Sequence, residues 1–277
     1  MKRQGTLVRI ITWVAWGLLG LGFLRVLLVS ATWDWDFVRR SLHVVLENLP
    51  LLLVGRFPAG QESLWGLGGL GLSVLLALVA MVGSFGLGLV AGIARLSARP
   101  YLRHPAVLYI EIIRGTPLIM VIVWFYFFMP IVTGRNFSLF TSAVVSLTMF
   151  TGAYLAEIVR AGIQAVPAGQ REAALATGLT SGQVLRHIVL PQALQIMIPA
   201  LVSQFIALFK DTSLAFVIGV TELMAMAQAV NNREIYYPFA IYLTVGLLYF
   251  IACFALSRLA RRLERRLPPG TLMELPS

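Results

Sequence analysis

Six stretches of this 277-residue chain are apolar over about twenty residues or more, and this pattern restricts the fold more than any other feature. They cover residues 10–30, 66–94, 105–131, 137–158, 196–220 and 237–256. Charged residues make up 12% of the chain, whereas a soluble domain carries roughly 25%. A soluble globular domain and a disordered chain are therefore excluded, and the alternating pattern of a membrane β-barrel does not fit. The sequence predicts an all-α, polytopic helical membrane protein with about six spans.

The first apolar stretch follows three basic residues, which is also the arrangement found in signal peptides. Its apolar run is longer than the roughly 7–15 residues of a signal peptide, and no good small-residue cleavage site follows it. An uncleaved first helix is therefore favoured. After it, residues 37–54 mix apolar and charged side chains, which is typical of a helix lying at the membrane surface.

Basic residues are unevenly divided between the segments that connect the predicted spans. With the N-terminus in the cytoplasm, 14 of the 22 lysines and arginines lie in inner segments and five in outer segments. The positive-inside rule then places both termini in the cytoplasm. The same bias accounts for the net charge of +10 without a nucleic-acid partner.

The inner segment 160–192 is long for a simple connection and contains its own helix signals. Pro167 and Gly169 break the preceding helix, residues 170–177 favour a short helix, and Gly178 stands where a glycine cap belongs. A second short helix is predicted over 181–188, beginning at a Ser or Thr cap and ending before Pro191. Two short helices joined by a glycine form a rigid projection suited to a groove on a partner protein.

At fixed spacing, the segment contains Glu172, Ala173, Ala174, Gly178, Ile188, Leu190 and Pro191. These residues resemble the EAA signature of permease subunits of bacterial ABC importers. Segments 111–117, 152–160 and 210–214 further resemble the polar amino acid branch of that family. The resemblance covers about residues 65–263 and implies the transmembrane domain of a type I ABC importer over 66–258. Residues 1–65 would add an extra span and an outer segment, and 259–277 a basic cytoplasmic tail.

The resemblance also implies the partners and the function. We expect a permease subunit of the bacterial inner membrane, paired with a second identical or homologous permease, that moves polar amino acids by alternating access. ABC ATPase subunits would dock on the EAA loop, and a substrate-binding protein would deliver the amino acid from outside. Lys2 and Lys210 are the chain's lysines and neither follows a glycine, so it lacks a P-loop. ATP and magnesium would therefore be bound by the ATPase; we expect no enzyme activity, cofactor or metal in this chain.

An ion-coupled secondary amino acid transporter is the alternative, because acidic residues and interrupted spans also suit that class. It offers no explanation for the EAA signature. An intramembrane enzyme is disfavoured, since no paired catalytic motif is present.

Several charged residues lie within or near the apolar stretches, where a charge costs roughly 2.5–3.5 kcal/mol and usually faces a cavity or a partner. The candidates for a substrate pathway are Glu111, Arg114, Lys210, Asp211, Thr212 and Ser213. One interpretation is a pocket for a zwitterion near the middle of the membrane, which is favoured for residues 210–213. The other is structural ion pairing, for example between Glu111 and Arg114, and for these two residues both interpretations stay open. Glu157 is expected to pair with Arg160.

Two further segments leave alternatives open. Ser84, Gly88 and Gly92 recur every four residues, which allows close helix packing either within the subunit or against a second permease. Residues 217–229, which include Glu222, would either close the outer mouth or form an ordinary surface loop.

Overall fold

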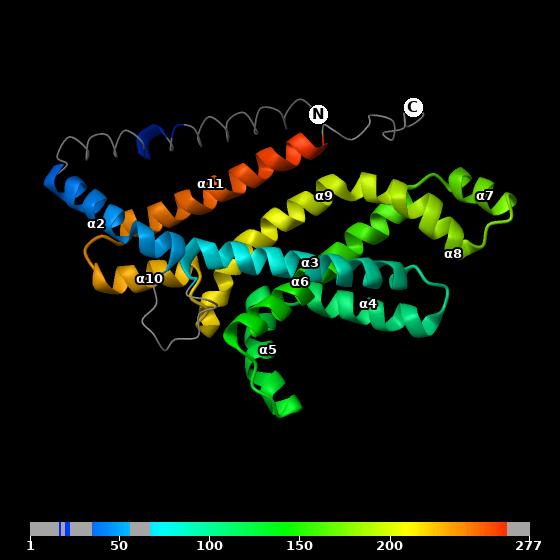
Figure 1. Cartoon of the computed structure of the whole chain (residues 1–277), viewed down its shortest axis with the longest axis horizontal. Coiled ribbons are helices and arrows are strands. Elements are labelled where there is room, and N and C mark those ends of the chain that lie inside the picture. Colours follow the sequence, from blue (N-terminus) through cyan, green and yellow to red (C-terminus); the bar gives the residue numbers. More distant parts are fainter. Residues whose placement is uncertain (1–16, 18–19, 23–34, 56–66, 265–277) are drawn as a thin grey trace. The chain divides into compact units, whose positions relative to one another are not determined.

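The computed structural model describes residues 17, 20–22, 35–55 and 67–264, and the chain divides into two compact units, residues 1–47 and 48–277. Helices make up the described part, which contains no strand (Figure 1). The helix expected over 37–54 is present as α2 (Trp35–Val54), while its place at the membrane surface stays a prediction. The helices that follow are α3 (Gly69–Arg95), α4 (Pro100–Arg114), α5 (Leu118–Thr133), α6 (Leu139–Ala165), α7 (Ala168–Ala176), α8 (Ser181–Val184), η2 (Leu185–Val189), α9 (Leu190–Asp211), η3 (Thr212–Ile218), α10 (Leu223–Arg233) and α11 (Pro238–Glu264).

Four helical stretches among the described residues are long and apolar enough to cross a membrane: α3, α6, Ser181–Ile218 and α11. The bent pair α4–α5 brings the number to five if it counts as one span. The 27 residues of α3 measure about 40 Å, which exceeds the roughly 30 Å of a bilayer's hydrocarbon core. Most of the predicted first span, 10–30, lies outside the described residues, so the total of six stays a prediction.

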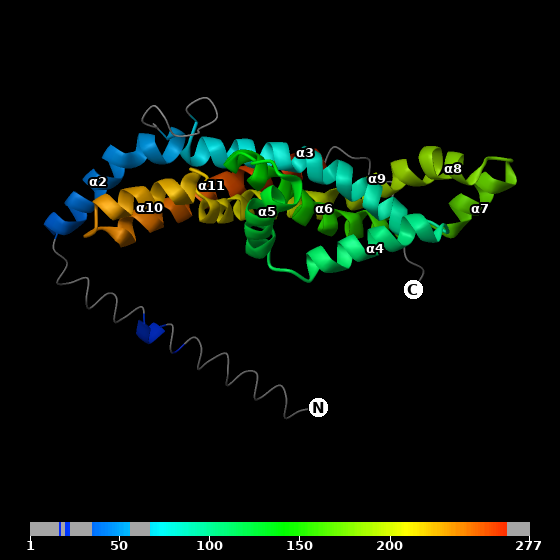
Figure 2. The ribbon, with the colours of Figure 1, turned by 90° about the horizontal axis from the view of Figure 1, so that it is seen from below.

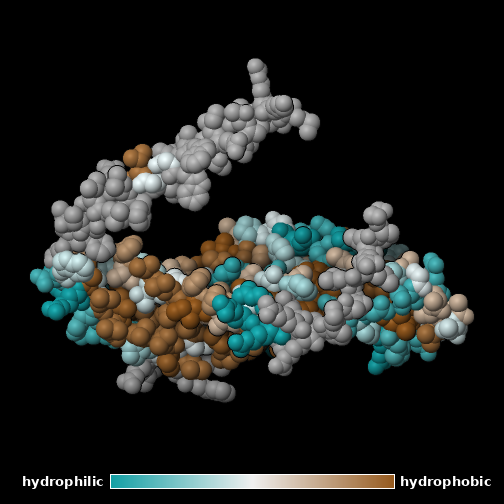
Figure 3. Space-filling view, turned by 90° about the horizontal axis from the view of Figure 1, so that it is seen from above, coloured by the Kyte–Doolittle hydropathy of each residue, from teal (hydrophilic) through white to brown (hydrophobic). Residues whose placement is uncertain are grey.

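The surface of these helices is apolar, as a surface in contact with lipid must be. Val82 and Phe250, for example, are 73% and 63% exposed although both lie on membrane-spanning helices. Figure 3 shows a large hydrophobic area on the visible face, with hydrophilic residues in several patches beside it. The apolar stretches of the sequence therefore supply both the core and the outer surface of the bundle.

The predicted continuous span 105–131 is wrong, because the structure breaks it into α4 and α5, which are bent by 110°. The break falls at Gly115, Thr116 and Pro117, and Gly115 ends α4. Proline disfavours the helical conformation of the residue before it, which favours an end of α4 before Thr116. Figures 1 and 2 show α5 running crosswise to the long helices. Arg114 thus lies at the end of a helix instead of in the middle of a continuous span.

The predicted second short helix of the inner segment is also wrong at its C-terminal end. α8 continues through the π-helix η2 into α9, giving one helical run from Ser181 to Ile218. Pro191 stands in the first turn of α9, where its missing N–H is tolerated. The Leu190 N–H bonds to the Leu185 carbonyl, five residues earlier, so the wider π turn accommodates the entry to the proline.

The small residues of α3 pack within the subunit, against α6. A Cβ added at Gly88 would lie 2.5 Å from the Leu155 Cβ, and one at Gly92 would lie 2.6 Å from the Ala156 carbonyl oxygen. Such distances are too short for any side chain, so glycine is required there. This contact holds α3 and α6 together beside the core cluster in which Leu155 and Val159 are buried.

Candidate functional site

The EAA segment forms a projection of two helices. α7 ends at Ala176, and Gly178 then adopts a φ of +84°, a left-handed conformation that favours glycine. Thr180 begins α8 with a capping box, in which its side chain and that of Gln183 bond to each other's backbone N–H groups. Figure 1 shows α7 and α8 beyond the neighbouring ends of α3 and α4. The predicted glycine turn and Thr cap are therefore confirmed.

The projection is fixed to the bundle through its apolar side chains. Ala174, Val184 and Val189 are buried in one cluster with residues of α6 and α9, and Ile188 and Leu190 pack against it. Glu172, Ala173, Gly178 and Pro191 are exposed. The signature therefore combines residues that fix the projection and residues that a partner could contact.

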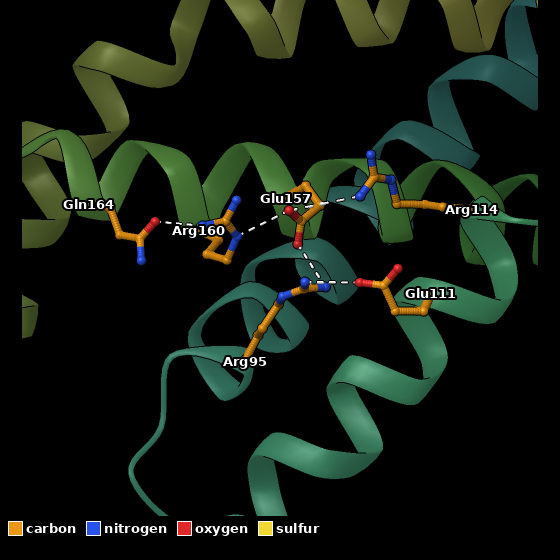
Figure 4. Close-up of polar contacts among 6 residues, drawn as sticks. All are labelled: Arg95, Glu111, Arg114, Glu157, Arg160 and Gln164. Atoms are coloured by element: carbon orange, nitrogen blue, oxygen red, sulfur yellow. Dashed lines mark hydrogen bonds and ion pairs between the residues drawn. The ribbon is translucent and has the colours of Figure 1, made fainter.

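A network of charged residues lies where α3, α4 and α6 meet (Figure 4). The Glu157 carboxylate lies 3.0 Å from Arg95 Nη1, 3.0 Å from Arg160 Nε and 3.8 Å from Arg114 Nη1. Arg95 also bonds to Glu111 Oε1 at 2.9 Å. Glu157 is the centre of the network, because it contacts three guanidinium groups from three helices.

The network confirms one sequence expectation and corrects another. The expected ion pair between Glu157 and Arg160 is present. Structural ion pairing is present for both Glu111 and Arg114, but the pair given as the example is wrong, since Glu111 pairs with Arg95 and Arg114 with Glu157. The Arg114 guanidinium also lies 5.4 Å from the centre of the Tyr154 ring, a distance at which a cation is attracted to the ring face. Glu111 and Arg114 still lie three residues apart on α4, but each of them pairs with a residue of another helix.

Residues 210–213 stand where α9 changes into a 3₁₀ helix. Lys210 is exposed, Asp211 and Ser213 are half-buried, and the buried Thr212 donates its hydroxyl to the Phe209 carbonyl at 2.8 Å. Within residues 67–264, no ion pair links Lys210 or Asp211 to Glu111 or Arg114. The structure thus divides the sequence-predicted pathway residues between two places, and Lys210 faces outward from the subunit.

Glu222 is a polar centre that the sequence did not distinguish. Its fully buried carboxylate caps α10 by accepting hydrogen bonds from the Met224 and Ala225 N–H groups, both at 2.9 Å. The Tyr249 hydroxyl of α11 donates to it at 3.0 Å, and the Ser73 hydroxyl of α3 at 3.3 Å. Burial raises the pKa of the Glu222 carboxyl to about 7, although these four hydrogen bonds lower it in part.

This geometry excludes an ordinary surface loop over 217–229, because α10 packs its buried side chains against the bundle. A role in closing the outer mouth stays a prediction. Glutamate is an uncommon helix cap, so the local sequence gave little sign of this arrangement. Among the described residues, no group of three or more His, Cys, Asp or Glu side chains is placed to hold a metal ion.

Comparison with known proteins places these features in a family. Residues 84–268 match the family described as the inner membrane component of binding-protein-dependent transport systems. The chain is 37% identical to the glutamine transport system permease protein GlnP of Escherichia coli K12, covering 84% of this chain and 97% of that protein. It is also 37% identical to the L-cystine transport system permease protein TcyB of Bacillus subtilis, covering 80% and 97%.

A solved structure supports the same assignment. The crystal structure of an amino acid ABC transporter with histidines contains a chain that is 35% identical to this one. The two superpose with a TM-score of 0.66, over 72% of this chain and 92% of that chain. The family match covers about two thirds of this chain. The chain therefore belongs to the inner-membrane permease components of binding-protein-dependent ABC transport systems.

Proposed function

We propose that the chain is the permease subunit of an ATP-driven importer of polar amino acids in a bacterial inner membrane. The exposed EAA residues on a rigid projection carry this proposal, because they offer a docking surface outside the membrane-spanning helices. Relatives named for glutamine and cystine and a neighbour titled as an amino acid transporter support the class of cargo. No comparison favours the ion-coupled alternative.

The proposed complex contains two ABC ATPase subunits, a second permease and a substrate-binding protein at the outer face. ATP and magnesium belong to the ATPase subunits. Closure of the ATPase pair would push on the projection, and the apolar contacts of Ala174, Val184 and Val189 would pass that force to α6 and α9. Glu172 is exposed on α7 and is the residue that we expect to contact the ATPase through its charge.

Reconstituted transport tests this role of the projection. Proteoliposomes that contain the purified chain and its partners should take up amino acid when ATP is supplied on the side of the ATPase subunits. This uptake should need no ion gradient. Glu172→Lys should leave membrane insertion unchanged, because the side chain is exposed, but should reduce both ATPase co-purification and uptake. Arg171→Gln, a charge change at the exposed neighbouring position, is the control. Normal co-purification and uptake in Glu172→Lys would contradict the proposed docking.

We also propose that residues 210–213, with Glu111 and Arg114, contribute to the substrate pathway. Lys210 supports this because it is exposed on a membrane-spanning run, where an exposed charge requires a polar cavity or a partner subunit. A free amino acid carries both charges and can satisfy a base and an acid together. Asp211→Asn and Lys210→Met should each reduce uptake in assembled complexes that retain ATPase activity.

Ser203→Ala is the matched control for the pathway, because Ser203 lies exposed on the same helix and its hydroxyl donates to the Pro199 carbonyl of its own helix. If both charge variants transport normally, residues 210–213 do not form the pathway, although the ATPase docking could still hold. The two proposals therefore fail independently.

The cytoplasmic location of both termini is part of the proposal. A cysteine at position 135, in a Cys253→Ser background, should react with an impermeant thiol reagent from outside. A cysteine at position 181, on α8, should react only after the membrane is opened. Both positions are exposed, so burial does not protect either of them. The reverse labelling pattern would overturn the orientation.

A further inference from the structure

A cavity of about 400 Å³ opens beside the α3–α4 connection and is separate from the EAA projection. α3 contributes Arg95, α4 contributes Arg103, and α6 contributes Arg160 and Gln164 to its lining. Ser97 of the connection completes the polar wall. Its volume lies within the roughly 300–1,000 Å³ of small-molecule sites. Three arginines around one cavity indicate an anionic ligand.

The charges around the cavity are only partly compensated. Arg95 and Arg160 both contact Glu157, so one carboxylate is shared between them. Arg103 is exposed and, among the described residues, has no ion pair or hydrogen bond to another side chain. Its planar guanidinium group is therefore available for a bidentate contact with a phosphate.

Neutral donors stand beside this free guanidinium. The Gln164 carbonyl oxygen accepts a hydrogen bond from Arg160, which leaves the amide NH₂ group able to donate. The Ser97 hydroxyl oxygen accepts from the Arg99 N–H at 3.2 Å, which leaves its own hydrogen able to donate. The cavity can thus offer a phosphate two hydrogen-bond donors besides the arginines.

The surroundings of the cavity distinguish a lipid from a free anion. On α4, Leu102 and Leu108 are exposed apolar residues, and the helical spacing places them on the two flanks of the face that carries Arg103 and Val107. They are 43% and 62% exposed and offer a surface for acyl chains. The cavity also lies at the end of the membrane-spanning α3, which is the depth of lipid headgroups. A free phosphate would need neither feature.

We propose that this cavity binds the headgroup phosphate of an anionic phospholipid such as phosphatidylglycerol. Basic pockets between transmembrane helices at the cytoplasmic side are a known type of headgroup site. The choice of the inner leaflet rests on the proposed orientation, whereas binding of the lipid does not. Because transport is not the readout, the site and the transport function can fail separately.

Native mass spectrometry of the full chain tests the site. Purified protein is equilibrated with detergent micelles containing equal amounts of phosphatidylglycerol and phosphatidylcholine, and the retained lipids are counted. The wild type should retain phosphatidylglycerol in preference. Arg103→Gln should reduce that retention roughly fivefold, the effect of about 1 kcal/mol per basic residue near a charged headgroup. Arg103→Lys should keep most of it.

Arg99→Gln is the matched control, because Arg99 lies on the same segment, four residues earlier, and does not line the cavity. It should reduce retention less than Arg103→Gln does. Equal losses in the two glutamine variants would mean diffuse charge attraction and would overturn the site, as would a wild type without lipid preference. Excess inorganic phosphate should displace little lipid; full displacement would assign the cavity to a free anion instead.

Discussion

Glu157 and Glu222 each join three helices of the second unit, but their surroundings compensate the carboxylate in different ways. Glu157 links α6 to α3 and α4 through contacts with three arginines. Glu222 links α10 to α3 and α11 through neutral donors. Among the described residues, no lysine, arginine or histidine lies within 4 Å of Glu222. One centre depends on opposite charges and the other on hydrogen bonds alone.

This difference determines what each carboxylate contributes. Removing the charge of Glu157 would leave three cations close together at a partly buried position, where their repulsion is poorly screened. Removing the charge of Glu222 would abolish the cost of burying an ion without a counter-ion, while most hydrogen bonds could remain. Replacing glutamate by glutamine should therefore lower the free energy of unfolding strongly at Glu157. At Glu222 the change in the free energy of unfolding should depend on pH.

Glu157→Gln should have the largest effect on stability, a loss of about 3 kcal/mol in the free energy of unfolding. Its side chain is 17% exposed, so water replaces the lost contacts poorly. Denaturant unfolding of the purified chain in detergent measures the loss.

Glu111→Gln is the control for that measurement. Glu111 is 57% exposed and contacts one arginine, so its loss should stay below about 1 kcal/mol. Similar losses in the two variants would show that the arginines do not depend on Glu157 as their common partner.

The sequence predicted the local features of these regions better than their long-range contacts. The Glu157–Arg160 pair and the Gly178 turn depend on residues close together in the chain, so spacing and backbone preference were sufficient. Arg95 and Arg114 reach Glu157 only because α3 and α4 pack on α6. The apolar stretch 105–131 also concealed the break before Pro117, since hydrophobicity does not report the direction of a helix.

Glu222 was missed for a related reason. Its donors Ser73 and Tyr249 are distant in the sequence, and a single glutamate before an alanine-rich stretch is equally typical of a surface. The core contact of α3 with α6 was partly predictable. The repeat of Ser84, Gly88 and Gly92 indicated a close helix neighbour, but only the structure identifies it as α6.

The second-largest effect should be a dependence of the protein's stability on pH, caused by the ionisation of Glu222. Its pKa is about 7 in the folded protein against 4.5 for the ordinary side chain, because burial disfavours the charged form. The unfolded chain therefore ionises first, and stability is greatest below about pH 4.5 and falls until the pH passes about 7. The loss between pH 5 and 8 should be roughly 2–3 kcal/mol.

Glu222→Gln tests this origin, because glutamine keeps the shape and cannot ionise. The variant should lose less stability than the wild type between pH 5 and 8, in the same unfolding measurement in detergent. If the variant's stability depends on pH as the wild type's does, other groups cause that dependence. The proposed difference between Glu222 and Glu157 would then be wrong.

Tyr249→Phe should have the smallest effect, and its dependence on pH makes it informative. The substitution removes one neutral donor to Glu222, a loss of about 1 kcal/mol for a buried hydrogen bond. Because that hydrogen bond lowers the pKa of Glu222, its removal should raise the pKa further above its ordinary value. The decline in stability should then continue to higher pH, so the variant should lose more stability relative to wild type at pH 8 than at pH 5.

Tyr242→Phe on the same helix, where the side chain is 37% exposed, is the control and should lose little stability at either pH. An equal loss for Tyr249→Phe at both pH values would mean that the hydroxyl does not stabilise the carboxylate in particular, and Glu222 would then depend on its own helix N-terminus.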